Sequence, residues 1–290
     1  MELWQAALLT LSTVIQFCCG NECPDQCSCS ENDNKTSVVC TSENITSFPS
    51  NLPHQSVFVS LIFTNVSGLA PDTLACLPQL EELDLSNNKL GSLPSTLFKH
   101  QLHMHTLDLS SNLLEGLPAS IFNTSASLKN LVLNGNRLMA LNCNWFHPLE
   151  KLEWLDVSKN RLRKISADCF LNLPSLKVLD LSHNDLQLLP DGLFFGVPNL
   201  ERLILENINL RVISEDAFTK MPNLKFLFLQ HNYLKNLPSM LLQPLSLLDT
   251  LDLSHNFLNS VPCDLFLKNT NLGNQFEQGL DLSWNPWHCD

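Results

Sequence analysis

Residues 176–186 read Leu-Lys-Val-Leu-Asp-Leu-Ser-His-Asn-Asp-Leu, and this stretch decides the fold. Leu179 and Leu181 alternate with Val178 and Asp180, which indicates a short strand with leucines on one face. An asparagine and another leucine follow where the chain must turn. The pattern returns every 24 residues, and eight copies keep register from residue 83 to residue 258 without an insertion. Self-similarity at such a period is the signature of a stacked repeat architecture.

The repeat carries three leucine columns, one asparagine column and one phenylalanine column. The first leucine column is Leu83, Leu107, Leu131, Leu155, Leu179, Leu203, Leu227 and Leu251. The asparagine column is Asn88, Asn112, Asn136, Asn160, Asn184, Asn232 and Asn256. The phenylalanine column is Phe98, Phe122, Phe146, Phe170, Phe194, Phe218 and Phe266. We expect the asparagines to hydrogen-bond backbone groups of their own turn and of the neighbouring coil. We expect the phenylalanines to fill the space behind the sheet.

The asparagine column breaks once. Ile208 stands at the asparagine position, between Asn207 and Asn209. One interpretation is a tolerated substitution with local repair of the lost hydrogen bonds. The other is a kink or a local change of curvature in the stack.

Composition agrees with a leucine-based repeat, because 61 of the 290 residues are leucine. Hydrophobic residues make up 44% of the chain and charged residues only 16%, which argues against intrinsic disorder. The formal net charge is -12. From that total we expect no basic face for phosphates, so nucleic acid and anionic membranes are poor partners.

The N-terminus predicts secretion. Residues 1–20 hold an apolar run from Leu3 to Phe17 and small residues near Gly20, as in a secretory signal peptide. A buried N-terminal helix is the alternative. No later stretch reaches about 18 uninterrupted apolar residues, so we expect no membrane span in the remainder. Four N-glycosylation sequons agree with an extracellular glycoprotein, and they begin at Asn34, Asn44, Asn65 and Asn123.

Nine of the eleven cysteines follow residue 20. Cys23, Cys27, Cys29 and Cys40 lie at tight spacing, and two bridges among them have three possible connectivities. Zinc is the rival interpretation, but no histidine lies among them and the expected compartment is oxidising. The sequence leaves open the pairing of Cys76, Cys143, Cys169, Cys263 and Cys289. For Cys169, beside the phenylalanine column, a buried free thiol is the first expectation and a bridge to Cys143 the alternative.

The columns match Leu-x-x-Leu-x-Leu-x-x-Asn-x-Leu, and the chain resembles the secreted leucine-rich-repeat proteins. That resemblance implies an α/β solenoid, a horseshoe with a parallel sheet on its concave face and a cysteine-rich cap at each end. The expected divisions are a cap over 21–57, nine to ten repeats over 58–282 and the opening of a second cap over 283–290, which looks truncated. The resemblance also implies the bridges Cys23–Cys29 and Cys27–Cys40.

The closing stretch 278–290 is similar to the leucine-rich alpha-2-glycoprotein family. This finer resemblance implies a modulator of transforming growth factor beta receptor signalling and a binder of cytochrome c, a basic protein. Two alternatives remain open. One is the non-catalytic regulatory subunit of a plasma peptidase, as in carboxypeptidase N, and the other is a truncated receptor ectodomain.

The residues between the strand leucines are expected to point out of the sheet. Two such columns predict an apolar centre within an acidic row, and exposed apolar side chains in a polar rim mark interaction sites. The predicted ligand-binding residues are Val132, Trp154, Val178, Ile204, Phe226, Phe228, Asp156 and Asp180. The alternatives are that the aspartates bond neighbouring serines as part of the repeat and that the apolar residues are incidental.

Catalytic patterns are missing from the sequence. It contains no Gly-x-Ser-x-Gly, no His-Glu-x-x-His and no phosphate-binding glycine loop, and glycine itself numbers only nine. His100, His103 and His105 could suggest a metal site, but three solvated histidines are the favoured interpretation because the trio spans a loop and the start of a strand. We therefore predict a binding protein without catalytic activity, cofactor or metal.

Overall fold

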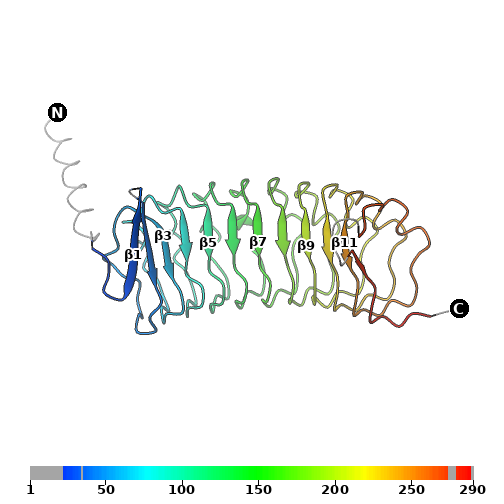
Figure 1. Ribbon diagram of the computed structural model, residues 1–290, viewed down its shortest axis with the longest axis horizontal. Helices are drawn as coiled ribbons and strands as arrows, with labels where there is room; N and C mark the ends of the chain where they lie inside the picture. The colour runs from blue at the N-terminus through cyan, green and yellow to red at the C-terminus, as the bar shows by residue number, and fades with distance from the viewer. Residues whose placement is uncertain (1–21, 34, 274–278, 289–290) are drawn as a thin grey trace, which may run out of the picture.

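The computed structural model describes residues 22–33, 35–273 and 279–288, and they form one 12-stranded sheet in chain order (Figure 1). The first two strands make an antiparallel hairpin, and every later strand runs parallel to its neighbours. The strands are β1 Cys27–Asn32, β2 Lys35–Cys40, β3 Ser56–Leu61, β4 Glu82–Asp84, β5 Thr106–Asp108, β6 Asn130–Val132, β7 Trp154–Asp156, β8 Val178–Asp180, β9 Arg202–Ile204, β10 Phe226–Phe228, β11 Thr250–Asp252 and β12 Leu280–Asp281. The predicted parallel-sheet repeat architecture is confirmed.

Each of the strands β4–β11 is only three residues long, and its central leucine faces the core. Leu179 of β8 is fully buried and lies in register with Leu155 of β7 and Leu203 of β9. This register follows from the 24-residue period, which places the same position of each copy on adjacent strands. The flanking residues of these strands lie on one shared surface, which we call the sheet face, and all but the buried Thr250 are at least partly exposed there.

The side opposite the sheet is built from turns. In the segment 190–197, N–H groups of Leu193 and Phe195 bond carbonyls three residues earlier, those of Pro190 and Gly192. Such single three-residue turns are too short to become α-helices. Within the described ranges the helical component is the 3₁₀-helix η1, Cys143–Trp145. The α part of the expected α/β solenoid is thus reduced to that one turn.

The phenylalanine column forms the spine of the core behind the sheet. The side chains from Phe98 to Phe218 in this column are at most 1% exposed. Two pairs of neighbouring rings stack along the solenoid, with centroids 6.0 Å apart for Phe98 and Phe122 and 6.2 Å apart for Phe194 and Phe218. The rings of Phe146 and Phe170 are tilted by 55° at 5.7 Å. Phe266 is only partly buried at the far end.

The asparagine column makes the predicted hydrogen bonds. The Nδ2 of Asn184 donates to the carbonyls of Val157 and Leu181, at 3.1 and 2.9 Å. Its Oδ1 accepts the Leu162 N–H at 3.0 Å. One side chain thereby bonds three backbone groups in two consecutive repeats. Without it, these buried groups would have no hydrogen-bond partner.

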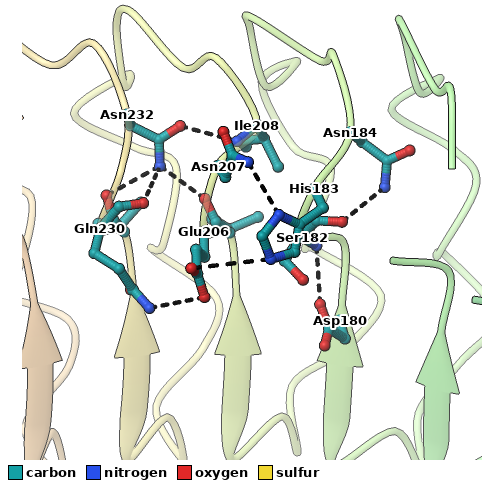
Figure 2. A network of polar contacts seen from close by, with 11 residues as sticks. Asp180, Ser182, His183, Asn184, Glu206, Asn207, Ile208, Gln230 and Asn232 are labelled. Carbon is teal, nitrogen blue, oxygen red and sulfur yellow. Dashed lines mark hydrogen bonds and ion pairs between the residues drawn. The ribbon is translucent and has the colours of Figure 1, made fainter. Parts of the chain in front are cut away.

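The break at Ile208 changes the local hydrogen bonding (Figure 2). The Ile208 side chain is fully buried and has no hydrogen-bonding group. Asn232 of the next repeat accepts two backbone N–H groups on its Oδ1, the usual one of the column from Leu210 at 2.9 Å and an additional one from Ile208 at 3.1 Å. The backbone also changes at this point, because Gln187 and Asn209 have positive φ angles of 57° and 60° and the Gln187 N–H bonds the Ile208 carbonyl at 3.0 Å. New hydrogen bonds and a local backbone change therefore occur together at the break.

Disulfides close the N-terminal hairpin. The bridges Cys23–Cys29 and Cys27–Cys40 are those that the family resemblance implied. The expectation of a free thiol at Cys169 was wrong, because Cys169 is bonded to Cys143 at the start of η1. These two cysteines are 26 residues apart and stand in different columns, but the turn at η1 brings their Cα atoms to 4.3 Å.

The structure describes only some of the other residues for which we made predictions about cysteines and the N-terminus. Cys76 is also disulfide-bonded. Cys263 is exposed, and it is the free cysteine among the described residues. The predicted signal peptide 1–20, the sequon at Asn34 and Cys289 lie outside the described residues. Within the described ranges, no helix has the length and apolar character needed to cross a membrane.

Candidate functional site

The sheet face presents two columns of side chains, one from the first and one from the third residue of each strand. Aspartate predominates in the third position. Each of these aspartates accepts the backbone N–H of the serine two residues on, as in Asp156 to Ser158 and Asp180 to Ser182, both at 2.9 Å. The predicted alternative, that the aspartates bond neighbouring serines, is therefore present in the structure. This bond fixes the turn that leaves the strand.

The aspartates lie close together and are half-buried. Burial raises the pKa of Asp180 above its ordinary value, while hydrogen bonds from Ser182 lower it and the neighbouring Asp156 raises it further. The pKa of Asp108 is raised in the same way, first by burial and then by Asp84 and Asp156. A row of such carboxylates is a negatively charged surface held in place by the repeat itself.

Three repeats abandon the aspartate–serine pair. Val132, Ile204 and Phe228 replace the aspartate, and the serine two residues later is replaced in the same three repeats by Asn134, Glu206 and Gln230. Two of the new polar residues bond each other, since Gln230 Nε2 donates to Glu206 Oε2 at 3.0 Å (Figure 2). The third, Asn134, donates from Nδ2 to Asp156 Oδ2 at 3.0 Å. Both members of the pair change together, so the apolar residues are not isolated substitutions within an intact turn.

The structure brings most of the predicted apolar residues together but not all. Trp154 and Val178 are register partners on β7 and β8, and Ile204 and Phe228 are register partners on β9 and β10. Trp154 is 47% exposed, and the others are half-buried. Val132 lies apart, because Asp156 and Asp180 occupy the two strands between it and Ile204.

Arg202 is the site residue that sequence reasoning missed. Its strand position lies between Val178 and Phe226. The guanidinium carbon is 4.2 Å from the Phe226 ring centroid and 5.3 Å from that of Phe228. This is cation–π geometry, and it holds one cation across two aromatic rings in the middle of the apolar group. The 24-residue spacing between Arg202 and Phe226 was the available signal. We call Trp154, Val178, Arg202, Ile204, Phe226 and Phe228 the apolar patch.

Charged residues border the sheet face on the side where the strands begin. Lys177 Nζ lies 2.6 Å from Glu153 Oε2, and Lys225 Nζ lies 2.9 Å from Glu201 Oε2. The contact with Lys177 lowers the pKa of Glu153. These charges alternate in sign from repeat to repeat and neutralise one another.

Two predicted glycosylation sites are open to solvent. Asn44, in the loop after β2, and Asn123, on a turn opposite the sheet, are both exposed. Asn65 is half-buried, and its Nδ2 donates to the Glu43 carbonyl at 2.7 Å. Among the residues that the structure describes, no group of three or more His, Cys, Asp or Glu side chains is arranged to hold a metal ion.

The sequence profile of the leucine rich repeat matches residues 102–162, 151–210 and 198–258, which is more than half of the chain, and a second repeat profile matches 79–100. The chain belongs to the leucine-rich-repeat family. Its 24-residue columns and parallel sheet are those of that family.

Known leucine-rich-repeat proteins resemble parts of this chain. A phospholipase A2 inhibitor from Gloydius brevicaudus siniticus is 44% identical over 68 residues, which are 23% of this chain and 20% of the inhibitor. Leucine-rich repeat-containing protein 3 from Danio rerio is 36% identical over 77 residues, 27% of this chain and 29% of that protein. Mouse podocan is 35% identical over 81 residues, 27% of this chain and 13% of podocan. The chain thus spans less than a third of the length of each of these relatives.

A solved structure resembles a larger share of the fold. A chain in the structure of the Toll–Spatzle complex from Drosophila superposes with a TM-score of 0.71 at 26% identity. The match covers 81% of this chain and 30% of that chain.

Proposed function

We propose that this leucine-rich-repeat protein is a secreted glycoprotein that binds other proteins through its sheet face, with the apolar patch as the centre of the interface. The repeat itself supplies a polar alternative at these positions, the aspartate–serine pair. Within the patch, two repeats discard it for Ile204 and Phe228 on a surface that faces water, and a third repeat does so at Val132 nearby. That substitution is the observation on which the proposal rests, because aromatic anchors in a polar surround carry much of the energy of protein interfaces.

The electrostatics of the same face favour a basic partner. Asp156 and Asp180 flank the apolar patch, and the acidic row continues beyond it at Asp252. Opposite charges on a partner would speed its association and make binding salt-dependent. Glycans at Asn44 and Asn123, on the loop after β2 and on the side opposite the sheet, would leave this face open.

Resemblance to known proteins suggests three partners that can be tested directly. The resemblance of residues 278–290 to leucine-rich alpha-2-glycoprotein suggests transforming growth factor beta receptor components and cytochrome c. The 44% identity to a phospholipase A2 inhibitor suggests a phospholipase A2. A regulatory subunit of the carboxypeptidase N kind and a receptor ectodomain, as the likeness to the Toll–Spatzle structure suggests, are further alternatives. All five share a non-catalytic chain that acts by binding.

The proposal is tested by immobilising the secreted protein on a biosensor and passing cytochrome c, a transforming growth factor beta receptor ectodomain and a phospholipase A2 over it. For any binder, Trp154→Ala and Phe228→Ala are expected to raise the off-rate, each by about 2 kcal/mol or roughly 30-fold. Phe195→Ala is the matched control, because Phe195 is 48% exposed on a turn away from the sheet.

Loss of binding in the Phe195→Ala control, or unchanged binding in both patch variants with an unchanged circular dichroism spectrum, would place the interface elsewhere. Purified protein should also show no turnover of peptide or ester substrates. A hydrolytic activity that one point substitution abolishes would contradict the non-catalytic function.

A further inference from the structure

Basic residues gather on one edge of the solenoid, although the net charge of the chain is -12. After each of the strands β4–β11 the chain turns away from the sheet, through residues 87–92 in the first of these repeats and every 24 residues onward to 255–260. These turns share one edge because the strands are parallel. They hold two acids, Glu115 and Asp185. They hold eight of the 17 lysines and arginines, namely Lys89, Arg137, Lys159, Arg161, Arg163, Lys164, Arg211 and Lys235.

The centre of this edge is the turn 159–164, Lys-Asn-Arg-Leu-Arg-Lys. Asn160 and Leu162 point into the solenoid, where the asparagine column and the core hold them at 9% and 0% exposure. The four basic residues of the turn are all exposed. The repeat therefore forces these cations outward. We call this turn, with Arg137 before it and Arg211 after it, the basic edge.

On the opposite edge, lysines are neutralised by ion pairs with glutamates. The cations of the basic edge have no such pairs among the described residues. Lys35, Lys177 and Lys225 lie 2.6 to 2.9 Å from glutamates. Among the described residues, none of the ion pairs within 4.0 Å includes an arginine or lysine of the basic edge. Their charge is available to a ligand.

A hollow of about 400 Å³ adjoins the turn, beside the break in the asparagine column. Arg161, Arg163, His183 and Asn207 line it, together with Asp185. The one carboxylate there is already satisfied, because Asp185 Oδ1 accepts hydrogen bonds from the side chains of Gln187 and Asn209, both at 3.0 Å. Figure 2 shows His183 and Asn207 beyond the ends of the strands, bonded to each other at 3.0 Å.

We propose that the basic edge is a second binding site, separate from the apolar patch, and that its ligand is a linear sulfated polysaccharide. Clustered lysines and arginines of this kind are typical of surfaces that bind nucleic acid or heparin. From Arg137 to Arg211 the basic edge spans four consecutive repeats, roughly 15 Å at the spacing between strands, and three of the four turns carry its cations, while the turn 183–188 carries Asp185. A thin polyanion lying along the edge contacts them in succession.

The acidic sheet face argues for a thin ligand. Asp156 and Asp180 each lie only three residues before one of these turns. A membrane surface or a DNA duplex is broad, and it would bring its own negative charge against those carboxylates. A single flexible sulfated chain follows the edge and leaves the sheet face clear. Both sites can then be occupied together.

The test is binding of the secreted protein to immobilised heparin at increasing NaCl. The triple variant Arg161→Gln, Arg163→Gln, Lys164→Gln is expected to bind at least about tenfold more weakly, with the log–log salt slope reduced by about 1 for each cation removed. The control Lys129→Gln, Lys177→Gln, Lys225→Gln removes the same charge from the other edge and should stay within about twofold of wild type. Thermal unfolding should confirm that both variants are folded.

Three results would overturn the proposal. The first is wild-type protein that does not bind heparin at low salt, and the second is an equal loss in both triple variants. The third is equally tight binding of fully desulfated heparin, single-stranded DNA or phosphatidylserine vesicles, which would exclude a site selective for sulfated polysaccharide. The apolar-patch variants Trp154→Ala and Phe228→Ala should bind heparin as wild type does, so this outcome is independent of the sheet-face function.

Discussion

At the scale of single residues, Asn232 has more backbone partners than the other asparagines of its column. Its Oδ1 accepts two N–H groups, from Ile208 and Leu210, whereas Asn184 Oδ1 accepts one, from Leu162. Each of these side chains donates to three carbonyls. Next to the break at Ile208, Asn232 therefore bonds one backbone N–H group more than the other asparagines of the column do.

We expect Asn232→Ala to destabilise the protein more than Asn184→Ala, by about 1–3 kcal/mol, because one more buried N–H loses its partner. Urea unfolding of the two variants measures the difference. Hydrogen exchange should locate the added opening in the turn 207–212. An equal loss of stability in the two variants would show that the shared acceptor contributes nothing.

Asp180 gives a prediction about pH. Burial raises its pKa above 3.8, so the folded state binds more protons than the unfolded state just above that value. The free energy of unfolding then falls as pH rises through this window, and the ionised carboxylate costs stability at neutral pH. Asp180→Asn keeps an oxygen for the Ser182 N–H without the charge. We expect the variant to be more stable than wild type at pH 7 and the difference to disappear below about pH 3.8.

Asp185→Asn is the control, because its expected change in stability at pH 7 has the opposite sign to that of Asp180→Asn. Hydrogen bonds from Gln187 and Asn209 lower the pKa of the Asp185 carboxyl, so its stabilising effect is present at neutral pH and is lost as pH falls through the lowered value. Thermal unfolding between pH 3 and pH 7 compares the two variants. Stability changes of the same sign at pH 7 would refute this account of the row of aspartates.

At the scale of elements, the bridge Cys143–Cys169 ties η1 to the turn of the next repeat. Cys169 is 1% exposed, so the bridge is anchored in the core on one side. The double variant Cys143→Ala, Cys169→Ala is expected to lose about 3 kcal/mol of stability, as is usual for a closed loop of this length. Cys263→Ala removes an exposed free thiol and should change stability by less than about 0.5 kcal/mol. Faster hydrogen exchange confined to residues 143–169 would confirm that the effect is local.

The 24-residue period predicts the features that every repeat shares, but not the contacts that occur in only one repeat. Strands, buried leucines, the asparagine hydrogen bonds and the phenylalanine spine all repeat at 24 residues, and each was predictable from one copy. The bridge Cys143–Cys169 was not, because its cysteines stand in different columns and meet only through the turn at η1. The contact of Arg202 with two aromatic rings was also not predicted. The position of a residue in the repeat indicates which way its side chain points, but not which side chains it contacts.

At the scale of the whole molecule, charge is segregated more strongly than the net value of -12 indicates. The sheet face carries the aspartate row, one edge carries paired charges, and the opposite edge carries cations without ion-pair partners among the described residues. An expectation drawn from the total charge, that no basic face exists, was wrong for this reason. Position in the repeat, rather than composition, determines what each surface can bind.

This arrangement allows a test of the sheet face that removes no side chain from the apolar patch. Val132→Thr creates the sequon Asn-Leu-Thr at Asn130, which lies on β6 in register with Trp154. A glycan attached there would cover the neighbouring patch. The glycosylated variant is expected to lose binding of whichever protein partner the biosensor identifies. Its affinity for heparin should be unchanged, because the basic edge lies beyond the far ends of the strands.

Val132→Ala is the matched control, since it alters the same position without adding a glycan. A mass increase over Val132→Ala that peptide N-glycosidase removes would establish that Asn130 is occupied, because both variants share the other sequons. Digestion of the native protein with peptide N-glycosidase removes the glycan and converts Asn130 to aspartate. Much of the binding should then return. Full partner affinity with the glycan in place would show that protein ligands approach a different surface, and the edges and the N-terminal hairpin would then be the surfaces to examine.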